Sequence, residues 1–574
     1  MDKKVFEFIS KQNNDPIVER KKCAATGKEY GIFASEVAFI DSVWPILQGK
    51  KYAIPASRFS PDERQRRRIA FRNFNYLYKT QCDASGQNII TMYRKPYTIY
   101  NNNLWRSDAW NPLDYGRDFD FSKTFTEQFA ALSLVVPKYA THNLNCENSQ
   151  YANMAANSKN CYLVFGCIEN EDCAYGHIVW YSQDLYNCAY TKSSQSSYEC
   201  IDCFQVTNVL FAKDCQNCSD SWLIYSCVGC HNCFGCVGLS NAQYCIFNKQ
   251  YSKEAYYNYL DTLNTADPNV LAKEQDKLQA LLDTMPRPAC DITESENCIG
   301  DYIIQSKNVL WFDIIGSEDV KYGYTIGKYI RSQDVSYAGI WSEQCYQTVF
   351  ARWWYNIVCG LNCQDGCRDM YYCDNCYSSQ NCFGCVGIRD KQYCIFNKQY
   401  SKEEYERLFA KIIEHMRSTG EWGEFFDPSL SPFGYNETIA NQYYPLSKTE
   451  AIAHGYPWCD YEAPLPMSNK VYKASELPIH TNEYNENVLQ AIVECERTGK
   501  PFRIIKTELD FYRRMKLPLP RLHPDVRSHD QLCQRHPRDL FIRNTNGKEI
   551  LSVYDSSQPF NVLDKEVYDK TFYG

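Results

Sequence analysis

The chain has 574 residues, of which 30 are cysteines and 15% are aromatic, and its formal net charge at pH 7 is -8. This length exceeds what one hydrophobic core covers and predicts about three or four domains. The net charge argues against a general affinity for nucleic acid or anionic membranes, so any such binding would be local. The first residues lack the apolar core of a secretory signal, and no run of roughly 18 apolar residues occurs, so we expect a cytoplasmic protein with reduced thiols and no membrane span.

Residues 1–140 are predicted to form paired ribbon-like modules. The phrases Cys23-Ala-Ala-Thr-Gly-Lys28 and Cys82-Asp-Ala-Ser-Gly-Gln87 each precede a strand-like apolar run. A zinc knuckle reads Cys-x-x-Cys-Gly, but Thr26 and Ser85 replace the second cysteine here, and a hydroxyl is a poor zinc ligand. We interpret these modules as degenerate zinc ribbons or treble clefs of α+β structure. No cofactor is favoured, and bound zinc is the alternative.

A basic stretch with interleaved aromatic residues follows the first knuckle. Its arginines, Arg64, Arg66, Arg67, Arg68 and Arg72, precede Phe74, Tyr76 and Tyr78. On one helix, such arginines could contact phosphates while the aromatic rings stack on bases. The favoured alternative is a helix with an aromatic core face, whose arginines pair with acids.

A second polar constellation consists of Asp114, Arg117, Asp118 and Asp120. Paired carboxylates beside an arginine suit general acid/base catalysis or a bound cation. Since neither a histidine nor a nucleophile lies nearby, we favour a turn held together by ion pairs.

A strict 12-residue recurrence starts in the next region. Turn-forming residues occupy Asn148, Asn160, Asp172, Asp184, Ser196, Asn208, Asp220 and Asn232. Each precedes an aromatic or large apolar residue by two or three positions, and cysteines recur at nearby phases. This pattern predicts a right-handed β-helix-like solenoid over residues 141–250, with either one or two of these repeats in each coil.

The densest thiol cluster closes this region and is echoed later in the chain. Its members are Cys227, Cys230, Cys233 and Cys236, followed by Cys373, Cys376, Cys382 and Cys385. Consecutive Cys-x-x-Cys pairs indicate a metal site in a ribbon, whereas in a solenoid the same spacing fills the stacked interior. We favour packing, because the 12-residue phase accounts for Cys227 and Cys233. A structural zinc or an iron–sulfur centre is the alternative.

The phrase from Tyr244 to Glu254 returns between Tyr393 and Glu403, which indicates a tandem duplication. We expect a helical capping segment at 251–290, a second solenoid at 291–398, and a helix with irregular structure at 399–480. Ser252 and Ser401 are predicted helix N-caps, and Ser401-x-x-Glu404 fits a capping box.

Residues 481–574 are predicted to form another pair of ribbon-like modules. Cys495-Glu-Arg-Thr-Gly-Lys500 and Arg543-Asn-Thr-Asn-Gly-Lys548 resemble the first two knuckles. The segment Arg521-Leu-His-Pro-Asp-Val-Arg527 also corresponds to Arg58-Phe-Ser-Pro-Asp-Glu-Arg64. Each end of the chain is therefore expected to hold two related knuckles.

Several phrases carry a resemblance across nearly the whole chain: Arg64–Asn73, Leu113–Phe121, the two Tyr-Cys-Ile-Phe-Asn-Lys-Gln-Tyr repeats, Pro432–Thr438 and Thr498–Ile505. In these the chain resembles an uncharacterised cysteine-rich family of candidate-phyla-radiation bacteria. The resemblance implies relatives with fuller Cys-x-x-Cys pairs in the terminal modules, and it implies no established activity.

The sequence as a whole predicts a mainly β fold, with tandem duplicated solenoids between degenerate ribbon modules. We expect a non-enzymatic scaffold that binds a macromolecule, either protein or RNA, through its solenoid faces and modules. A homo-oligomer could form through the same faces. The alternatives are a β-helix enzyme acting on a glycan, a zinc or iron–sulfur protein, and a nucleic-acid-binding protein.

Overall fold

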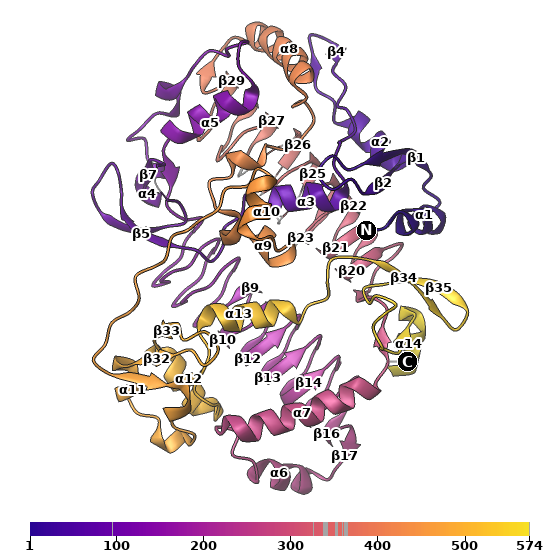
Figure 1. Ribbon diagram of the computed structural model, residues 1–574, viewed down its shortest axis with the longest axis vertical. Helices are drawn as coiled ribbons and strands as arrows, with labels where there is room; N and C mark the ends of the chain where they lie inside the picture. Colours follow the sequence, from indigo (N-terminus) through magenta and orange to yellow (C-terminus); the bar gives the residue numbers. More distant parts are fainter. Residues whose placement is uncertain are drawn as a thin grey trace. The chain divides into compact units, whose positions relative to one another are not determined.

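The computed structural model of the protein describes residues 1–94, 96–324, 326–336, 342–349, 354–358, 360 and 366–572. These residues form two compact units, each built from segments distant in sequence (Figure 1). Unit 1 comprises Met1–Ala140, Pro288–Asp460 and His536–Lys565, and unit 2 comprises Thr141–Arg287, Tyr461–Arg535 and Glu566–Gly574. Each unit therefore combines one of the two predicted repeat regions with segments from elsewhere in the chain.

The prediction of a mainly β fold with duplicated solenoids is wrong. The structure is mixed α/β, with 27% helical and 29% strand residues, and no sheet among the described residues is strongly curled or closed into a solenoid. Of the nine sheets that the described residues form, seven contain only two or three strands. Helices in the terminal segments raise the helical content above that of a mainly β fold. The short pairing segments of the repeat regions keep the strand content low.

We call residues 144–246 of unit 2 the first ladder. Its segments pair in parallel at a constant 12-residue offset, as for Thr207 opposite Ser219. Single bridges such as Leu144 with Ala156 keep this offset before the first strand. The strands are β9 (His177–Trp180), β10 (Gln183–Tyr186), β11 (Ala189–Lys192), β12 (Gln195–Ile201), β13 (Thr207–Lys213), β14 (Ser219–Tyr225), β15 (His231–Phe234) and β16 (Gln243–Ile246).

Left-handed residues interrupt the first ladder at nearly every third position. Asn145, Asn148, Tyr151 and Met154 begin this series with φ between 47° and 53°. Asn tolerates this conformation better than most residues, and its side chain can also bond to the next level. Asn148 Nδ2 donates to Asn160 Oδ1 at 3.0 Å, and Asn160 continues the row. The 12-residue recurrence in the sequence thus marks stacked turns.

We call residues 292–395 of unit 1 the second ladder. Its strands also pair in parallel, but the offset varies: it is 11 for Lys307 opposite Glu318, 12 for Glu318 opposite Ile330, and 13 for Tyr329 opposite Ser342. The strands are β19 (Ile292–Thr293), β20 (Ile299–Ile304), β21 (Lys307–Ile315), β22 (Glu318–Lys321), β23 (Ile326–Gly327), β24 (Tyr329–Gln333), β25 (Ser342–Tyr346), β26 (Trp354–Val358), β27 (Arg368–Tyr371), β28 (Gln380–Phe383) and β29 (Gln392–Ile395).

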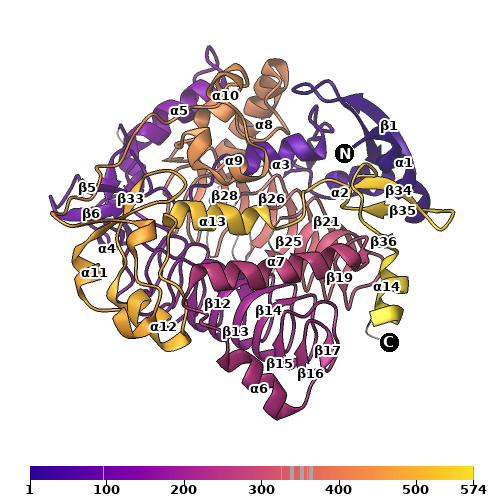
Figure 2. The ribbon, with the colours of Figure 1, turned by 60° about the horizontal axis from the view of Figure 1, so that its bottom comes forward.

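Both ladders end in the same way. A two-residue strand, β17 (Lys249–Gln250) or β30 (Lys398–Gln399), pairs antiparallel with the last parallel strand. The helices α6 (Lys253–Asp261) and α8 (Lys402–Thr419) follow, and the predicted N-caps Ser252 and Ser401 are confirmed. The Ser401–Glu404 capping box is also present. The predicted helical segment is completed by α7 (Pro268–Thr284), which runs across the strands of the first ladder (Figure 2).

The remaining elements of unit 1 surround the second ladder. Residues 1–140 supply α1 (Lys3–Gln12), β1 (Ile17–Lys22), β2 (Glu29–Phe33), α2 (Ala34–Ser42), β3 (Ile46–Leu47), β4 (Lys50–Lys51), α3 (Pro61–Ile69), β5 (Tyr78–Gln81), β6 (Asn88–Thr91), β7 (Ile99–Tyr100), α4 (Asn102–Arg106), η1 (Pro112–Tyr115), α5 (Phe125–Val135) and β8 (Lys138–Tyr139). Later segments supply η2 (Pro428–Leu430), η3 (Tyr435–Glu437), α9 (Ile439–Tyr443), α10 (Lys448–Ala453), β34 (Phe541–Thr545), β35 (Lys548–Ser552) and β36 (Val562–Leu563).

Unit 2 completes its fold with a C-terminal module. Its elements are β31 (Val471–Lys473), η4 (Ala474–Glu476), η5 (Thr481–Glu483), α11 (Asn487–Gln490), β32 (Ile492–Glu494), β33 (Pro501–Phe502), α12 (Lys506–Met515) and α13 (Pro524–Cys533). The last helix of the chain is α14 (Lys565–Phe572), and β18 (Arg287–Pro288) precedes the second ladder. Nowhere in the described residues is a helix both long enough and apolar enough to cross a membrane.

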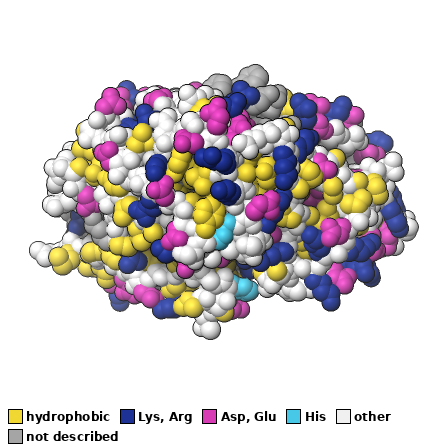
Figure 3. All heavy atoms as spheres, turned by 90° about the horizontal axis from the view of Figure 1, so that it is seen from above, with side chains coloured by type: hydrophobic (Ala, Val, Ile, Leu, Met, Phe, Trp, Pro, Cys, Tyr) yellow, Lys and Arg dark blue, Asp and Glu magenta, His cyan; other side chains and the backbone are white. Residues whose placement is uncertain are grey.

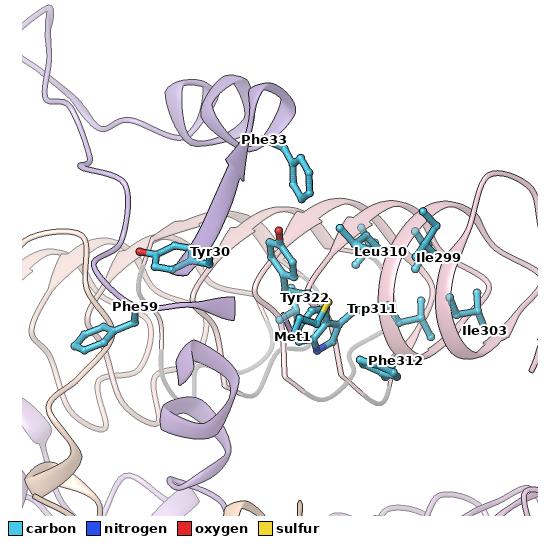
Figure 4. Close-up of a cluster of buried hydrophobic side chains, with 14 of the residues drawn as sticks. Met1, Tyr30, Phe33, Phe59, Ile299, Ile303, Leu310, Trp311, Phe312 and Tyr322 are labelled. Carbon is cyan, nitrogen blue, oxygen red and sulfur yellow. The ribbon is translucent and has the colours of Figure 1, made fainter. Parts of the chain in front are cut away.

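The core of unit 1 joins the second ladder to the N-terminal module. Trp311 and Tyr322 are both 0% exposed, and they pack with Phe33 in one apolar cluster. Figure 4 shows Tyr322 rising from the ladder toward the segments that carry Tyr30 and Phe33. Burying each such side chain contributes roughly 1.5–3 kcal/mol, so this cluster fixes the module against the ladder.

Candidate functional site

The second ladder carries a groove of about 740 Å³ that is open to solvent. It is lined by Glu294, Ser295, Glu296, Gln305, Ser306, Lys307, Gly316, Ser317, Glu318 and Ile330. These residues come from successive levels of the ladder, and all of them except Ile330 lie where the pairing offset is 11. Equivalent positions therefore stand side by side along the groove.

Three rows of side chains build the groove. The serines of the middle row are tied together, since Ser306 N–H donates to Ser295 Oγ at 3.0 Å and Ser317 N–H to Ser306 Oγ at 3.1 Å. In a flanking row, Gln305 Nε2 donates to Glu294 Oε2 at 2.8 Å. The next member of this row is Gly316, which leaves space where its neighbours carry long side chains.

The other flanking row is charged. Lys307 Nζ lies 3.3 Å from Glu296 Oε2, and the backbone of Lys307 stands opposite that of Glu318 in the ladder register. With Glu294, the lining contains three glutamates and one lysine. The excess of carboxylates favours a cationic ligand. Because these side chains are exposed, water solvates them when no ligand is bound. Figure 3 shows positive and negative side chains interspersed on the face it presents.

The knuckle cysteines keep a common turn without a metal cluster. The N–H of the knuckle glycine donates to the cysteine carbonyl at 2.8 Å in three modules, at Gly27, Gly86 and Gly499. The fourth phrase differs, because Thr545 pairs directly with Lys548 across a two-residue hairpin turn. This phrase therefore does not form the turn that the other three share.

Hydroxyl groups take the place of the missing ligands at these knuckles. Burial alone would raise the pKa of Cys23, but hydrogen bonds from Ser60 and Thr26 bring it below its usual value. Burial would also raise the pKa of Cys82, but hydrogen bonds from Ser85 and from the N–H of Asn101 bring it below its usual value. Each sulfur thus has hydrogen-bond donors around it. In the described residues, no group of three or more His, Cys, Asp or Glu side chains is placed to hold a metal.

The densest thiol cluster lies inside the ladders. Cys227, Cys230, Cys233 and Cys236 are each 0% exposed, as are Cys373, Cys376, Cys382 and Cys385. The thiols bond to main-chain carbonyls, as for Cys236 Sγ with Phe234 O at 3.3 Å and Cys245 O at 3.5 Å. Burial raises the pKa of Cys382 and Cys385 well above the usual value, so these thiols stay protonated. They serve as small core side chains in this arrangement.

The predicted acidic constellation, Asp114, Arg117, Asp118 and Asp120, lies on the surface of unit 1. Asp118 is 75% exposed and accepts from Lys398 Nζ at 2.7 Å, which lowers its pKa. Asp120 accepts from Ser122 Oγ at 2.6 Å, and this bond brings its pKa down to about 2. Asp118 and Asp120 bind different partners, so their contacts describe a turn rather than a shared reaction centre.

The predicted basic stretch lies largely inside unit 1. Arg64, Arg68 and Arg72 are 4%, 0% and 1% exposed. Arg66 Nη2 and Arg67 Nε lie 2.5 and 3.0 Å from the carboxylate of Glu63. These groups are bound to the protein itself and are not presented to a nucleic acid.

A further polar cluster joins the C-terminal segment of unit 1 to its ladder. His536 Nδ1 lies 2.8 Å from Asp301 Oδ2, and its Nε2 lies 2.9 Å from the Tyr554 hydroxyl. An Asp–His–Tyr row can relay a proton in principle. Here Asp301 is 0% and Tyr554 5% exposed, so the row anchors residues 536–554 to the ladder.

Sequence reasoning missed the groove and this anchor. The regular spacing of Ser295, Ser306 and Ser317 indicates the groove, but this spacing is one residue shorter than the 12-residue recurrence on which the prediction rests. His536, Asp301 and Tyr554 are too far apart in sequence to form a motif. No family model matches the chain, and no curated protein matches it.

Proposed function

We propose that the protein is a non-enzymatic scaffold that binds an extended, basic segment of a partner protein in the groove of the second ladder. The groove itself carries this proposal, because its side chains repeat along the direction in which the ladder levels stack. A ligand with its own repeat can meet equivalent groups at each level.

The dimensions and charge of the groove suit a peptide. Successive ladder levels are about 4.8 Å apart, and an extended peptide advances about 3.3 Å per residue, so a short segment spans several levels. Three glutamates against one lysine favour lysine or arginine side chains in the partner. The serines and Gln305 add hydrogen-bonding groups without adding charge.

Fluorescence anisotropy with the full-length protein tests the proposal. A labelled lysine-rich peptide should bind more tightly than a glutamate-rich peptide of equal length, and its affinity should fall as salt rises. Gly316→Gln should abolish binding by filling the groove. Its backbone, at φ 60°, resembles that of Gln305 at φ 49°, so a glutamine fits there without refolding the ladder.

Matched variants separate the groove from the general surface charge. Glu318→Gln should weaken binding severalfold, whereas Glu549→Gln, an exposed glutamate on β35 of the same unit, should leave it unchanged. Absence of lysine-rich peptide binding at low salt, or equal binding by Gly316→Gln, contradicts the proposal. Preferential binding of a polyanion or a neutral glycan would also overturn it.

A further inference from the structure

The two units contain the same buried junction between a terminal module and a ladder. Glu36 follows Cys23 at the same distance along the chain as Glu508 follows Cys495. Each glutamate accepts a hydrogen bond of 2.7 Å from a tyrosine hydroxyl of its ladder. The donor is Tyr322 in unit 1 and Tyr175 in unit 2.

An arginine completes each junction. Arg64 of α3 and Arg527 of α13 occupy the same place in the matching phrases Arg58–Arg64 and Arg521–Arg527. Arg64 lies over the ring of Tyr322, 5.0 Å from its centroid, and Arg527 lies 4.4 Å from the centroid of Tyr175. The modules therefore dock on their ladders through equivalent residues.

The junctions differ in one pair of positions. In unit 1, Arg68 Nη1 lies 2.9 Å from Asp334 Oδ1, and both residues are 0% exposed. The residues that hold the same places relative to the arginine and the tyrosine of unit 2 are Gln531 and Asn187. Gln531 Nε2 donates to the main-chain carbonyl of Asn187, and both are buried. The side chain of Asn187 accepts from Arg527 Nη1 at 3.2 Å, so a charged pair in one unit corresponds to two neutral amide side chains in the other.

Both versions give each buried arginine of the junction a carboxylate partner. In unit 1, Glu36 and Asp334 oppose Arg64 and Arg68, and in unit 2, Glu508 opposes Arg527. If a module docked on the other ladder, one buried charge would be unmatched. Arg68 would then face an amide, or Asp334 would lose one of its two arginines. An unmatched buried charge is strongly destabilising.

We infer that the pairs Arg68–Asp334 and Gln531–Asn187 are a recognition code that directs each terminal module to its own ladder. The modules share the glutamate and the arginine, so those residues alone do not distinguish the two ladders. The matched pair does, because it penalises the wrong combination.

Hydrogen exchange of the full-length protein tests this code locally. Arg68→Gln and Asp334→Asn should each accelerate amide exchange in α3 on the order of 100-fold, and the double variant should return exchange to within several-fold of the original rate. Exchange in β27 to β29 should stay unchanged in all variants, which shows that the ladder itself remains folded. The inference is overturned if amides of α3 exchange as fast in the double variant as in the single variants. It is also overturned if the single variants exchange like the original protein.

The reciprocal exchange in unit 2 provides an independent test. Asn187→Asp and Gln531→Arg should each accelerate exchange in α13, and together they should restore protection by importing the charged pair. If the unit 1 variants fail to fold, this pair of substitutions decides the matter. Lack of recovery in the double variant would reject the code.

Discussion

Replacing Gly235 by alanine should destabilise unit 2 through a defined steric conflict. Gly235 belongs to the repeated Cys-Phe-Gly-Cys phrase and adopts φ +66°. A Cβ atom at this position would lie 2.3 Å from Cε1 and 2.6 Å from Cδ1 of Phe247. The left-handed backbone costs about 1–2 kcal/mol for a residue with a Cβ, and the overlap adds about 1–3 kcal/mol. Summing these two costs, we expect the free energy of unfolding to fall by about 2–5 kcal/mol.

Gly499 offers a matched control in the same unit. Its φ is +69°, and a Cβ there would meet nothing within 4 Å, so Gly499→Ala should show only the backbone cost. Urea titration measures the free energy of unfolding of both variants, and hydrogen exchange in β15 and β16 then locates the loss. Equal losses for Gly235→Ala and Gly499→Ala would refute the steric explanation. The same conflict exists at Gly384, whose added Cβ would lie 2.5 Å from Phe396.

Three further outcomes follow from local contacts. Ser401→Ala should lower the free energy of unfolding by about 1 kcal/mol, measured by urea titration, because it removes the α8 cap. Burial lowers the pKa of His523 to about 4, so the unfolded protein takes up a proton between pH 6.5 and 4. The contribution of His523 to the free energy of unfolding should therefore be constant above pH 6.5 and fall by up to about 3 kcal/mol toward pH 4. His523→Asn, which can still cap α13, should lose this part of the pH dependence in urea titrations. Cys533 is exposed, so mass-spectrometric mapping of brief alkylation should find it modified before the 23 buried cysteines among the described residues, and early modification inside a ladder would contradict the packing.

The periodic parts of the fold could be predicted, and the long-range parts could not. The spacing from Asn148 to Asn232 indicated the 12-residue register, and Ser401-x-x-Glu404 indicated the helix start, since both depend on near neighbours. The left-handed turn at nearly every third residue was missed, because Tyr151 and Met154 are not typical turn residues. This omission led to the wrong expectation of a mainly β fold, because turns at that spacing leave only short strands.

The candidate site was missed for a related reason. The groove depends on a pairing offset that is one residue shorter than in the first ladder, whereas the predicted solenoid rested on a 12-residue period. The favoured interpretation of the arginine stretch was a helix whose arginines pair with acids, and Arg66 and Arg67 of α3 do pair with Glu63. The partner of Arg64, Asp334, lies 270 residues away in the sequence. Contacts at such separations follow from the docking of a module and leave no local pattern.

The ladder also explains why Cys227 to Cys236 imitates a metal motif. Interior positions form columns at 12-residue steps, and each column mixes cysteine with other small side chains. One column reads Ser194, Val206, Cys218, Cys230 and Ala242, and another reads Ser197, Val209, Ser221, Cys233 and Cys245. Serine makes the same bond as cysteine there, since Ser221 Oγ donates to Ser219 O at 2.7 Å and Cys233 Sγ to His231 O at 3.6 Å. A site that accepts serine, valine or alanine one level away selects for size rather than for a thiolate ligand. The four cysteines therefore lie close together in the sequence because adjacent columns each place a small residue at the same level.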